Sequence, residues 1–122
     1  FGYGLSYSDF AYEKIESFKQ DKKNIRVTVS VKNTSGRDGE EVVKVYDSYP
    51  ESKVERPSKQ LRAFRRIPIK AGETRKVTLT VPKEELGYWN EGKQMFVVEP
   101  GTVKLLIGAS SEDIRLEGKI RL

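Results

Sequence analysis

Residues 25–32 alternate strictly between apolar and polar side chains, and this pattern constrains the fold more than any other feature of the sequence. Successive side chains of an extended strand point to opposite faces, so the pattern predicts a β-strand with one buried side and one solvent-facing side. Similar alternation at residues 77–81, 103–107 and 114–122 predicts further strands of the same kind. The apolar members of the first segment are Ile25, Val27, Val29 and Val31, and the polar members are Arg26, Thr28, Ser30 and Lys32.

The intervening segments fit an all-β plan. A first strand is predicted over residues 9–18, bent or bulged near Asp9, and a return strand over residues 41–46. Together with a short strand at residues 95–98, these segments make about seven strands spaced roughly ten residues apart, with turn-forming residues between them. The predicted fold is an antiparallel two-sheet β-sandwich.

Two segments interrupt the simple alternation. Leu61, Phe64 and Ile67 recur at a spacing of three, and Pro68 closes the run after a few residues. A spacing of three could mean a helical turn, but because the run is so short we interpret it as a short, irregular edge strand that is rich in positive charge. Cationic edges resist the addition of another strand. The string PKEEL at residues 82–86 has proline first and acidic side chains next, which predicts one short helical turn.

The predicted core consists of the apolar side chains that share one phase of each strand. A large-to-small or polar replacement there is expected to destabilise the protein by about 2 to 5 kcal/mol. The predicted core residues are Val27, Val29, Val31, Val43, Val45, Phe64, Val77, Leu79, Val97, Val103, Leu105, Ile107, Ile114 and Leu116.

Composition narrows the chemistry that the chain can perform. The 122 residues include no histidine and no cysteine, which excludes disulfides, thiol nucleophiles, Cys/His zinc sites and imidazole-dependent triads. No metal site and no cofactor are predicted. The net charge of +5 comes from 23 basic and 18 acidic residues spread along the chain, without the basic stripe of a nucleic-acid module. No apolar run approaches the roughly 20 residues that span a bilayer. We therefore expect neither a nucleic-acid nor a membrane partner.

The remaining candidate sites each have a structural interpretation beside the functional one. Adjacent carboxylates occur at residues 40–41, 84–85 and 112–113, but glycoside hydrolysis needs two carboxyl groups that face each other across a bond. Tyr88 and Trp89 could form a sugar-stacking platform, although a lone tryptophan is also a common sandwich anchor. The basic residues at 62, 65 and 66 could bind a polyanion, although a solvated edge strand also explains them.

The first eight residues form a separate pattern. Phe1, Tyr3, Leu5 and Tyr7 alternate with glycine and serine, which would place every large side chain on one face of an extended arm. We expect this arm to lie against another surface. The absence of an initiating methionine predicts a processed chain or a piece of a longer one.

Five strings carry a resemblance to a known family, and they cover nearly the whole chain. They are FGYGLSYSDFAY, NTSGRDGEEVVKVY, RPSKQLRAFRRI, AGETRKVTLTV and VEPGTVKLLIGASSEDIRL, in this order. Together they resemble the fibronectin type III-like domain that ends many family 3 glycoside hydrolases, the β-glucosidases and β-xylosidases. The chain departs from the family pattern at residues 47–55, where the family often continues a more apolar strand.

The resemblance implies an enzyme with a catalytic barrel, an α/β sandwich and then this domain. The family's nucleophilic aspartate lies in the barrel and its acid/base glutamate generally in the second domain, so no residue of this chain has an implied catalytic role. Residues 1–8 resemble the connecting segment. We therefore expect a linker arm at residues 1–8 and a sandwich at residues 9–122. The expected interdomain docking residues are Phe1, Tyr3, Leu5 and Tyr7.

Three functions stay open at this point. The leading hypothesis is a non-catalytic C-terminal module that supports the catalytic domains of the same polypeptide, or contacts a second subunit, and lends a loop toward substrate. The alternative is a free-standing carbohydrate- or protein-binding module that uses Tyr88 and Trp89 on glycans. The third is polyanion binding through Arg62, Arg65 and Arg66. The family favours a periplasmic or secreted location, but the sequence itself does not indicate the compartment.

Overall fold

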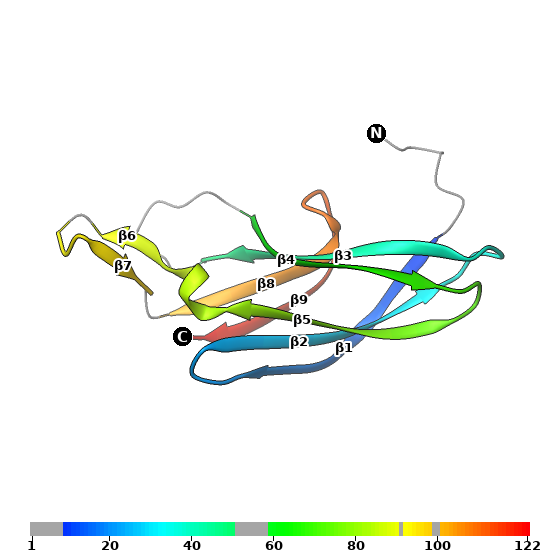
Figure 1. Ribbon diagram of the computed structural model, residues 1–122, viewed down its shortest axis with the longest axis horizontal. Helices are drawn as coiled ribbons and strands as arrows, with labels where there is room; N and C mark the ends of the chain where they lie inside the picture. Colours follow the sequence, from blue (N-terminus) through cyan, green and yellow to red (C-terminus); the bar gives the residue numbers. More distant parts are fainter. Residues whose placement is uncertain (1–8, 51–58, 91, 99–100) are drawn as a thin grey trace.

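The structure is a computed structural model, and it describes residues 9–50, 59–90, 92–98 and 101–122. At residues 88–90 and 96 it describes the backbone alone. Two antiparallel sheets face each other along the long axis of the molecule, as the alternating strands predict (Figure 1).

The first sheet has three strands in the order β1-β2-β5 and the second has four in the order β4-β3-β8-β9. The three strands are β1 (Phe10–Gln20), β2 (Asn24–Asn33) and β5 (Thr74–Pro82). The four strands are β3 (Gly39–Ser48), β4 (Gln60–Ile69), β8 (Thr102–Ser110) and β9 (Asp113–Arg121). A short hairpin of β6 (Tyr88–Asn90) and β7 (Met95–Val97) projects from one end, after the 3₁₀ turn η1 (Lys83–Leu86) (Figure 1). The predicted seven-stranded sandwich with one helical turn is confirmed.

The core lies between the two sheets, and the inward phases of β2, β3, β5 and β8 supply most of it. Because one chain provides both layers and a closed apolar centre, we expect residues 1–122 to fold without a partner. The buried cluster is Tyr12, Ile25, Val27, Val29, Val31, Val43, Val45, Ile67, Ile69, Val77, Leu79, Val81, Leu86, Val103, Leu105 and Ile107.

The predicted phase of β4 is wrong. Phe64 is 63% exposed, not part of the core, and Ile67 and Ile69 point inward instead. Phe64 pairs with Lys44, whose neighbours Val43 and Val45 occupy the inward phase, so Phe64 lies on the outer face of the sheet. The spacing of three from Leu61 to Phe64 arises because β4 and β3 shift register between Val45 and Tyr46.

β4 is an edge strand, as predicted, but it is neither short nor closed by Pro68. It runs for ten residues to Ile69 and contains Pro68, which pairs with Glu40 in the register. Proline cannot donate a ladder hydrogen bond, so its place on an edge strand is consistent with the topology.

The irregularity predicted near Asp9 lies further along β1. The register of β1 against β2 shifts between Tyr12 and Lys14 and again between Ile15 and Ser17. Each shift changes which face of the sheet the following side chains occupy, and this explains the uneven spacing of apolar residues in β1.

The structure also corrects the predicted core at Val97 and Ile114, which are half-buried and outside the core cluster, whereas the half-buried Leu116 packs against that cluster. Val97 belongs to the separate β6–β7 hairpin. Ile114 pairs with Gly108, whereas Leu116 pairs with the inward-facing Ile107. A register shift between these two pairs places Ile114 and Leu116 on different faces, although their spacing of two predicts the same face.

Candidate functional site

One end of the sandwich gathers η1, the β6–β7 hairpin and the β1–β2 turn (Figure 1). In η1, Pro82 is the N-cap with φ −64°, Leu86 is buried, and Glu84 and Glu85 face solvent. Gly87 donates its backbone N–H to the Glu84 carbonyl at 3.3 Å and ends the turn. The proline and the acidic first turn are the signals that predicted this element.

A fully buried carboxylate lies at the loop-side end of β3. Asp47 is 0% exposed and accepts three hydrogen bonds. Its Oδ2 accepts from Arg62 Nε at 2.5 Å and from the Tyr49 hydroxyl at 2.7 Å, and its Oδ1 accepts from the Gln60 backbone N–H at 3.2 Å. A buried carboxylate needs such partners to remain charged. The contacts with Arg62 and Gln60 join the end of β3 to the start of β4.

The structure corrects two expectations at this site. β3 continues past the predicted end at residue 46 to Ser48, so the departure from the family pattern begins inside a strand. Arg62 is not a solvated edge cation, since its side chain is only 19% exposed. Burial lowers the pKa of the Arg62 guanidinium, but the hydrogen bond and the charge of Asp47 outweigh burial and raise that pKa above its ordinary value.

The ion pair also contacts η1 indirectly. The Tyr49 hydroxyl lies 3.4 Å from the Leu86 carbonyl oxygen, and Leu86 is a core residue. Asp47, Tyr49 and Arg62 therefore connect β3, β4 and η1 at this end of the sandwich. Because Asp47 has no exposed surface and its oxygens are already occupied, we assign it a structural role and not general acid/base chemistry.

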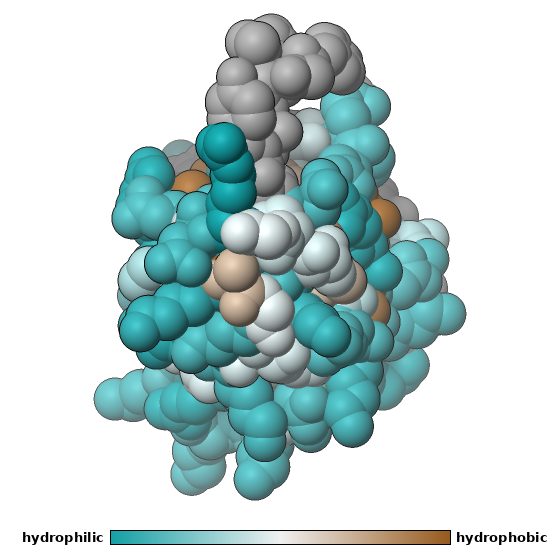
Figure 2. Space-filling model, turned by 90° about the vertical axis from the view of Figure 1, so that its right-hand side faces the viewer, coloured by the Kyte–Doolittle hydropathy of each residue, from teal (hydrophilic) through white to brown (hydrophobic). Residues whose placement is uncertain are grey.

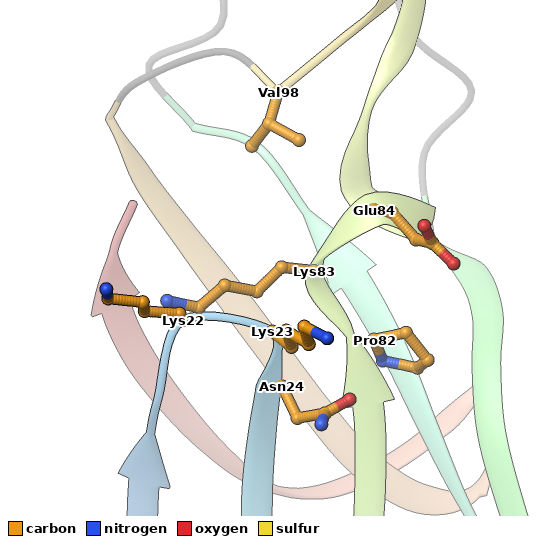
Figure 3. Close-up of a pocket in the computed structure, with 7 residues that line it drawn as sticks. All are labelled: Lys22, Lys23, Asn24, Pro82, Lys83, Glu84 and Val98. Carbon is orange, nitrogen blue, oxygen red and sulfur yellow. The ribbon is translucent and has the colours of Figure 1, made fainter.

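Two hollows flank η1. One, of about 570 Å³, is lined by Arg62, Glu84, Glu85 and Gly87. The other is about 610 Å³, and Figure 3 shows Lys83 reaching from η1 toward the β1–β2 turn that carries Lys22. The Lys83 backbone N–H donates to the Lys23 carbonyl at 2.8 Å, which joins the two elements. The residues that line the second hollow are Lys22, Lys23, Asn24, Pro82, Lys83, Glu84 and Val98.

The adjacent carboxylates are not arranged as a catalytic pair. Glu40 lies 3.4 Å from Arg66, whereas its neighbour Glu41 accepts from the Tyr12 hydroxyl at 3.0 Å. Asp113 pairs with Arg115 at 2.6 Å. Within the described part of the chain, no group of three or more Asp or Glu residues could hold a metal ion. The side chains of Glu84 and Glu85 are exposed on η1.

The predicted glycan contacts cannot be placed as side chains. Tyr88 and Trp89 form the first two positions of β6, where they pair with Val97 and Phe96. Their side chains lie outside the described part of the structure, so the stacking platform stays a prediction. The predicted docking residues Phe1, Tyr3, Leu5 and Tyr7 also lie outside the described residues.

The point where the arm joins the sandwich is described. The Asp9 carbonyl accepts from the Thr34 backbone N–H at 2.9 Å, and the Phe10 carbonyl accepts from Arg115 at 2.9 Å. Arg115 belongs to β9, so this hydrogen bond connects the start of β1 to an edge strand of the opposite sheet. The same guanidinium lies 5.3 Å from the centre of the Tyr12 ring.

Tyr12 is expected to stay protonated while the protein is folded. Burial raises the pKa of the Tyr12 phenol far above its usual range, and the charge and hydrogen bond of Glu41 raise it further, against a smaller lowering by Arg115. Because the unfolded state would release this proton near its ordinary pKa of 10.0, stability is lost as the pH rises above that value.

An alkaline absorbance titration tests this prediction. The wild-type chain and a Tyr12→Phe variant should show equal phenolate absorbance for as long as both remain folded, because the other five of the six tyrosines are common to both. A wild-type signal that exceeds the variant's by one tyrosine near pH 10, with the fold intact by circular dichroism, would contradict the assignment.

The buried ion pair is the feature that the sequence analysis missed. A lone aspartate after the string VVKVY resembles the start of a polar loop, and its partner Arg62 is 15 residues away. The only available signal was an arginine beside the first apolar residue of the next strand. Pairing the two requires the register of β3 and β4, which the sequence pattern did not supply.

The fold and these contacts define an antiparallel two-sheet sandwich domain whose described charged clusters stabilise the structure. A family model, the fibronectin type III-like domain, matches residues 41–111, from β3 through β8. The chain therefore belongs to the fibronectin type III-like domain family.

Its relatives are β-glucosidases that are much longer than this chain. Probable beta-glucosidase D of Emericella nidulans is 35% identical over 97% of the chain, and thermostable beta-glucosidase B of Acetivibrio thermocellus is 38% identical over all of it. The chain spans 17% of the length of each of these relatives.

Solved structures agree on the fold. The beta-glucosidase of Kluyveromyces marxianus in complex with glucose matches with a TM-score of 0.91 at 37% identity, over 100% of this chain and 15% of that one. Beta-glucosidase 3B of Thermotoga neapolitana matches with a TM-score of 0.88 at 37% identity, over 99% of this chain and 17% of the other. Among the described residues, no helix is long and apolar enough to span a bilayer.

Proposed function

We propose that this chain is a non-catalytic module of a longer family 3 β-glycosidase, and that it supports the catalytic domains of the same polypeptide by packing against them. One observation carries the proposal: nearly the whole length of the chain aligns with a region that makes up about a sixth of the length of β-glucosidases from a fungus and a bacterium. A β-glucoside is accordingly the substrate class of the whole protein. The described residues support a non-catalytic role, since their carboxylates lie in ion pairs, hydrogen bonds and exposed turns.

In this proposal residues 1–8 are the arm that joins the sandwich, residues 9–122, to an upstream domain. Phe1, Tyr3, Leu5 and Tyr7 form its docking face. Hydrogen bonds at Asp9 and Phe10 support this role, because they hold the junction between arm and sandwich in place. An arm whose junction with the sandwich is fixed limits the orientations that the sandwich and the upstream domain can adopt.

The isolated chain is expected to hydrolyse neither aryl β-glucosides nor aryl β-xylosides. The assay uses purified residues 1–122 at high concentration, with a β-glucosidase from a commercial source as the positive control. Turnover that co-purifies with the chain through two columns would overturn the inactive-module proposal. Titration with cello- and xylo-oligosaccharides tests the alternative: saturable binding that Trp89→Ala abolishes would make the chain a glycan-binding module.

A further inference from the structure

The outer faces of the two sheets differ in chemistry. On the three-stranded sheet, the outward positions of β2 and β5 are polar, and they pair across the strands as Arg26 with Thr80 and Thr28 with Thr78. The two threonine hydroxyls lie 2.8 Å apart. Most of these outward side chains can bind water or one another, although the buried Ser30 hydroxyl has no hydrogen-bond partner among the described residues.

The central strands of the four-stranded sheet each carry a large apolar side chain on the outer face as well as apolar side chains on the inner one. In β3, Tyr46 points away from the core yet is only 7% exposed, and in β8 Leu106 does the same at 7%. Neither belongs to the core cluster between the sheets. Strands that are apolar on both sides are typical of sheets that are covered on both sides. The sequence shows the same feature in the strings VVKVY and LLI, where an extra apolar residue stands beside the alternating core residues.

Two exposed side chains of β4 extend this apolar surface. Leu61 is 46% exposed and pairs with Tyr46, which pairs on its other side with Leu106. Phe64, at 63% exposure, lies opposite Lys44, two positions from Tyr46. Tyr46, Leu61, Phe64 and Leu106 therefore lie on one side of three neighbouring strands, with Leu61 and Phe64 as its exposed members; we call this side the outer apolar face.

Basic side chains outnumber acidic ones around the outer apolar face, where Glu117 pairs in the register with Leu106. The Lys44 ammonium donates to the Ala109 carbonyl at 3.1 Å, and Lys104 pairs in the register with Lys119 of β9. Arg66 lies beyond Phe64 on the same face and is near Glu40 at 3.4 Å. By contrast, the end of the sandwich seen in Figure 2 is mostly hydrophilic. A surface with an apolar centre and acidic groups around it would complement this face.

We propose that the outer apolar face packs against the catalytic part of the same polypeptide; this inference rests on the proposed function. Two observations favour that occupant over a separate protein. The relatives carry more than four fifths of their length outside the aligned region, so a large covalently attached surface is present in them. The chain also enters the sandwich beside this sheet, because Arg115 of β9 holds the Phe10 carbonyl. Attachment at that edge keeps the partner surface close to the face.

Thiol labelling in the full-length polypeptide tests the proposal. This chain has no cysteine, so a single introduced thiol reports one position. Phe64→Cys marks the outer apolar face, and Thr80→Cys marks an exposed position on the opposite outer face. Maleimide labelling of each variant is followed by mass spectrometry of the labelled peptide, in the full-length polypeptide and in the isolated chain. Phe64→Cys should label about tenfold or more slowly in the full-length protein, because an interface excludes solvent. Thr80→Cys should label at the same rate in both.

Equal labelling of Phe64→Cys in both proteins would overturn the proposal. Leu61→Cys is tested in parallel because the loss of the Phe64 side chain could itself weaken docking. In that case the thiol of Leu61→Cys, which retains Phe64, would still be protected in the full-length protein. Protection that already appears in the isolated chain and increases with its concentration would assign the face to a second copy, and the proposal would be wrong. Hydrolysis of an aryl β-glucoside by the full-length protein is measured separately. Its absence would refute the proposed function, whereas unprotected thiols in an active enzyme would refute only the docking face.

Discussion

Replacing Asp47 with alanine is expected to lower the free energy of unfolding by about 2 to 4 kcal/mol, because it leaves a largely buried guanidinium without its carboxylate. The Tyr49 hydroxyl and the Gln60 backbone N–H would lose their acceptor in the same step. The expected loss is below the upper end for buried pairs because Arg62 retains 19% exposure and can turn toward water. Urea denaturation of the isolated chain measures the effect.

The matched control is Asp113→Ala, which removes a carboxylate from a short aspartate–arginine ion pair on the surface. Asp113 and Arg115 are 45% and 38% exposed, and exposed pairs contribute about 0 to 1 kcal/mol. If the Asp47 variant lost no more stability than the Asp113 variant, the buried ion pair would not stabilise this end of the sandwich as we describe.

Leu105→Ala is expected to cost about 2 to 5 kcal/mol, since it opens a cavity in the middle of the core. Leu105 is 0% exposed in β8 and pairs there with Asp47 of β3 and Gly118 of β9. Leu61→Ala makes the same chemical change at a 46% exposed position of β4 and should cost less than about 1 kcal/mol in the isolated chain. A loss below about half a kcal/mol for Leu105→Ala would show that the assigned strand phase is wrong.

Regular strands were predictable from the sequence because burial on one face imposes a period of two. The alternation at residues 25–32 and 103–107 correctly predicted β2 and β8, and with them most of the core. Turn-forming residues separated the strands, and PKEEL predicted η1. These local signals predicted sheets with one apolar face each, and because each apolar face must be covered, they also predicted two sheets packed together.

One error arose where two strands shift register, since Ile114 leaves the core because β8 and β9 shift at Gly108. Phe64 lies on the outer face because it pairs with the outward-facing Lys44, and the shift between Val45 and Tyr46 places Leu61 on that same face. A bulge inverts the side-chain phase without any change in apolar composition, so a pattern read along one strand does not reveal it. The position of Phe64 was unpredictable for a separate reason: the sequence does not tell which face of the sheet an aromatic side chain occupies.

The candidate site was less predictable than the fold. The structural interpretation of the adjacent carboxylates could be predicted from their positions beside turns. The Asp47–Arg62 ion pair depends on a contact between residues far apart in the sequence, and the role of Arg62 changes from solvated cation to buried partner once that contact is known. The docking arm and the Tyr88–Trp89 platform stay predictions, because their side chains lie outside the described part of the structure.

The most direct test of the module proposal is the hydrolysis of an aryl β-glucoside by the polypeptide translated from the complete reading frame that contains this chain. We expect a frame that continues upstream of Phe1 for several times the length of the chain. We expect its product to hydrolyse the substrate while isolated residues 1–122 do not. A start codon immediately before Phe1, or a full-length product without this activity, would contradict the proposal.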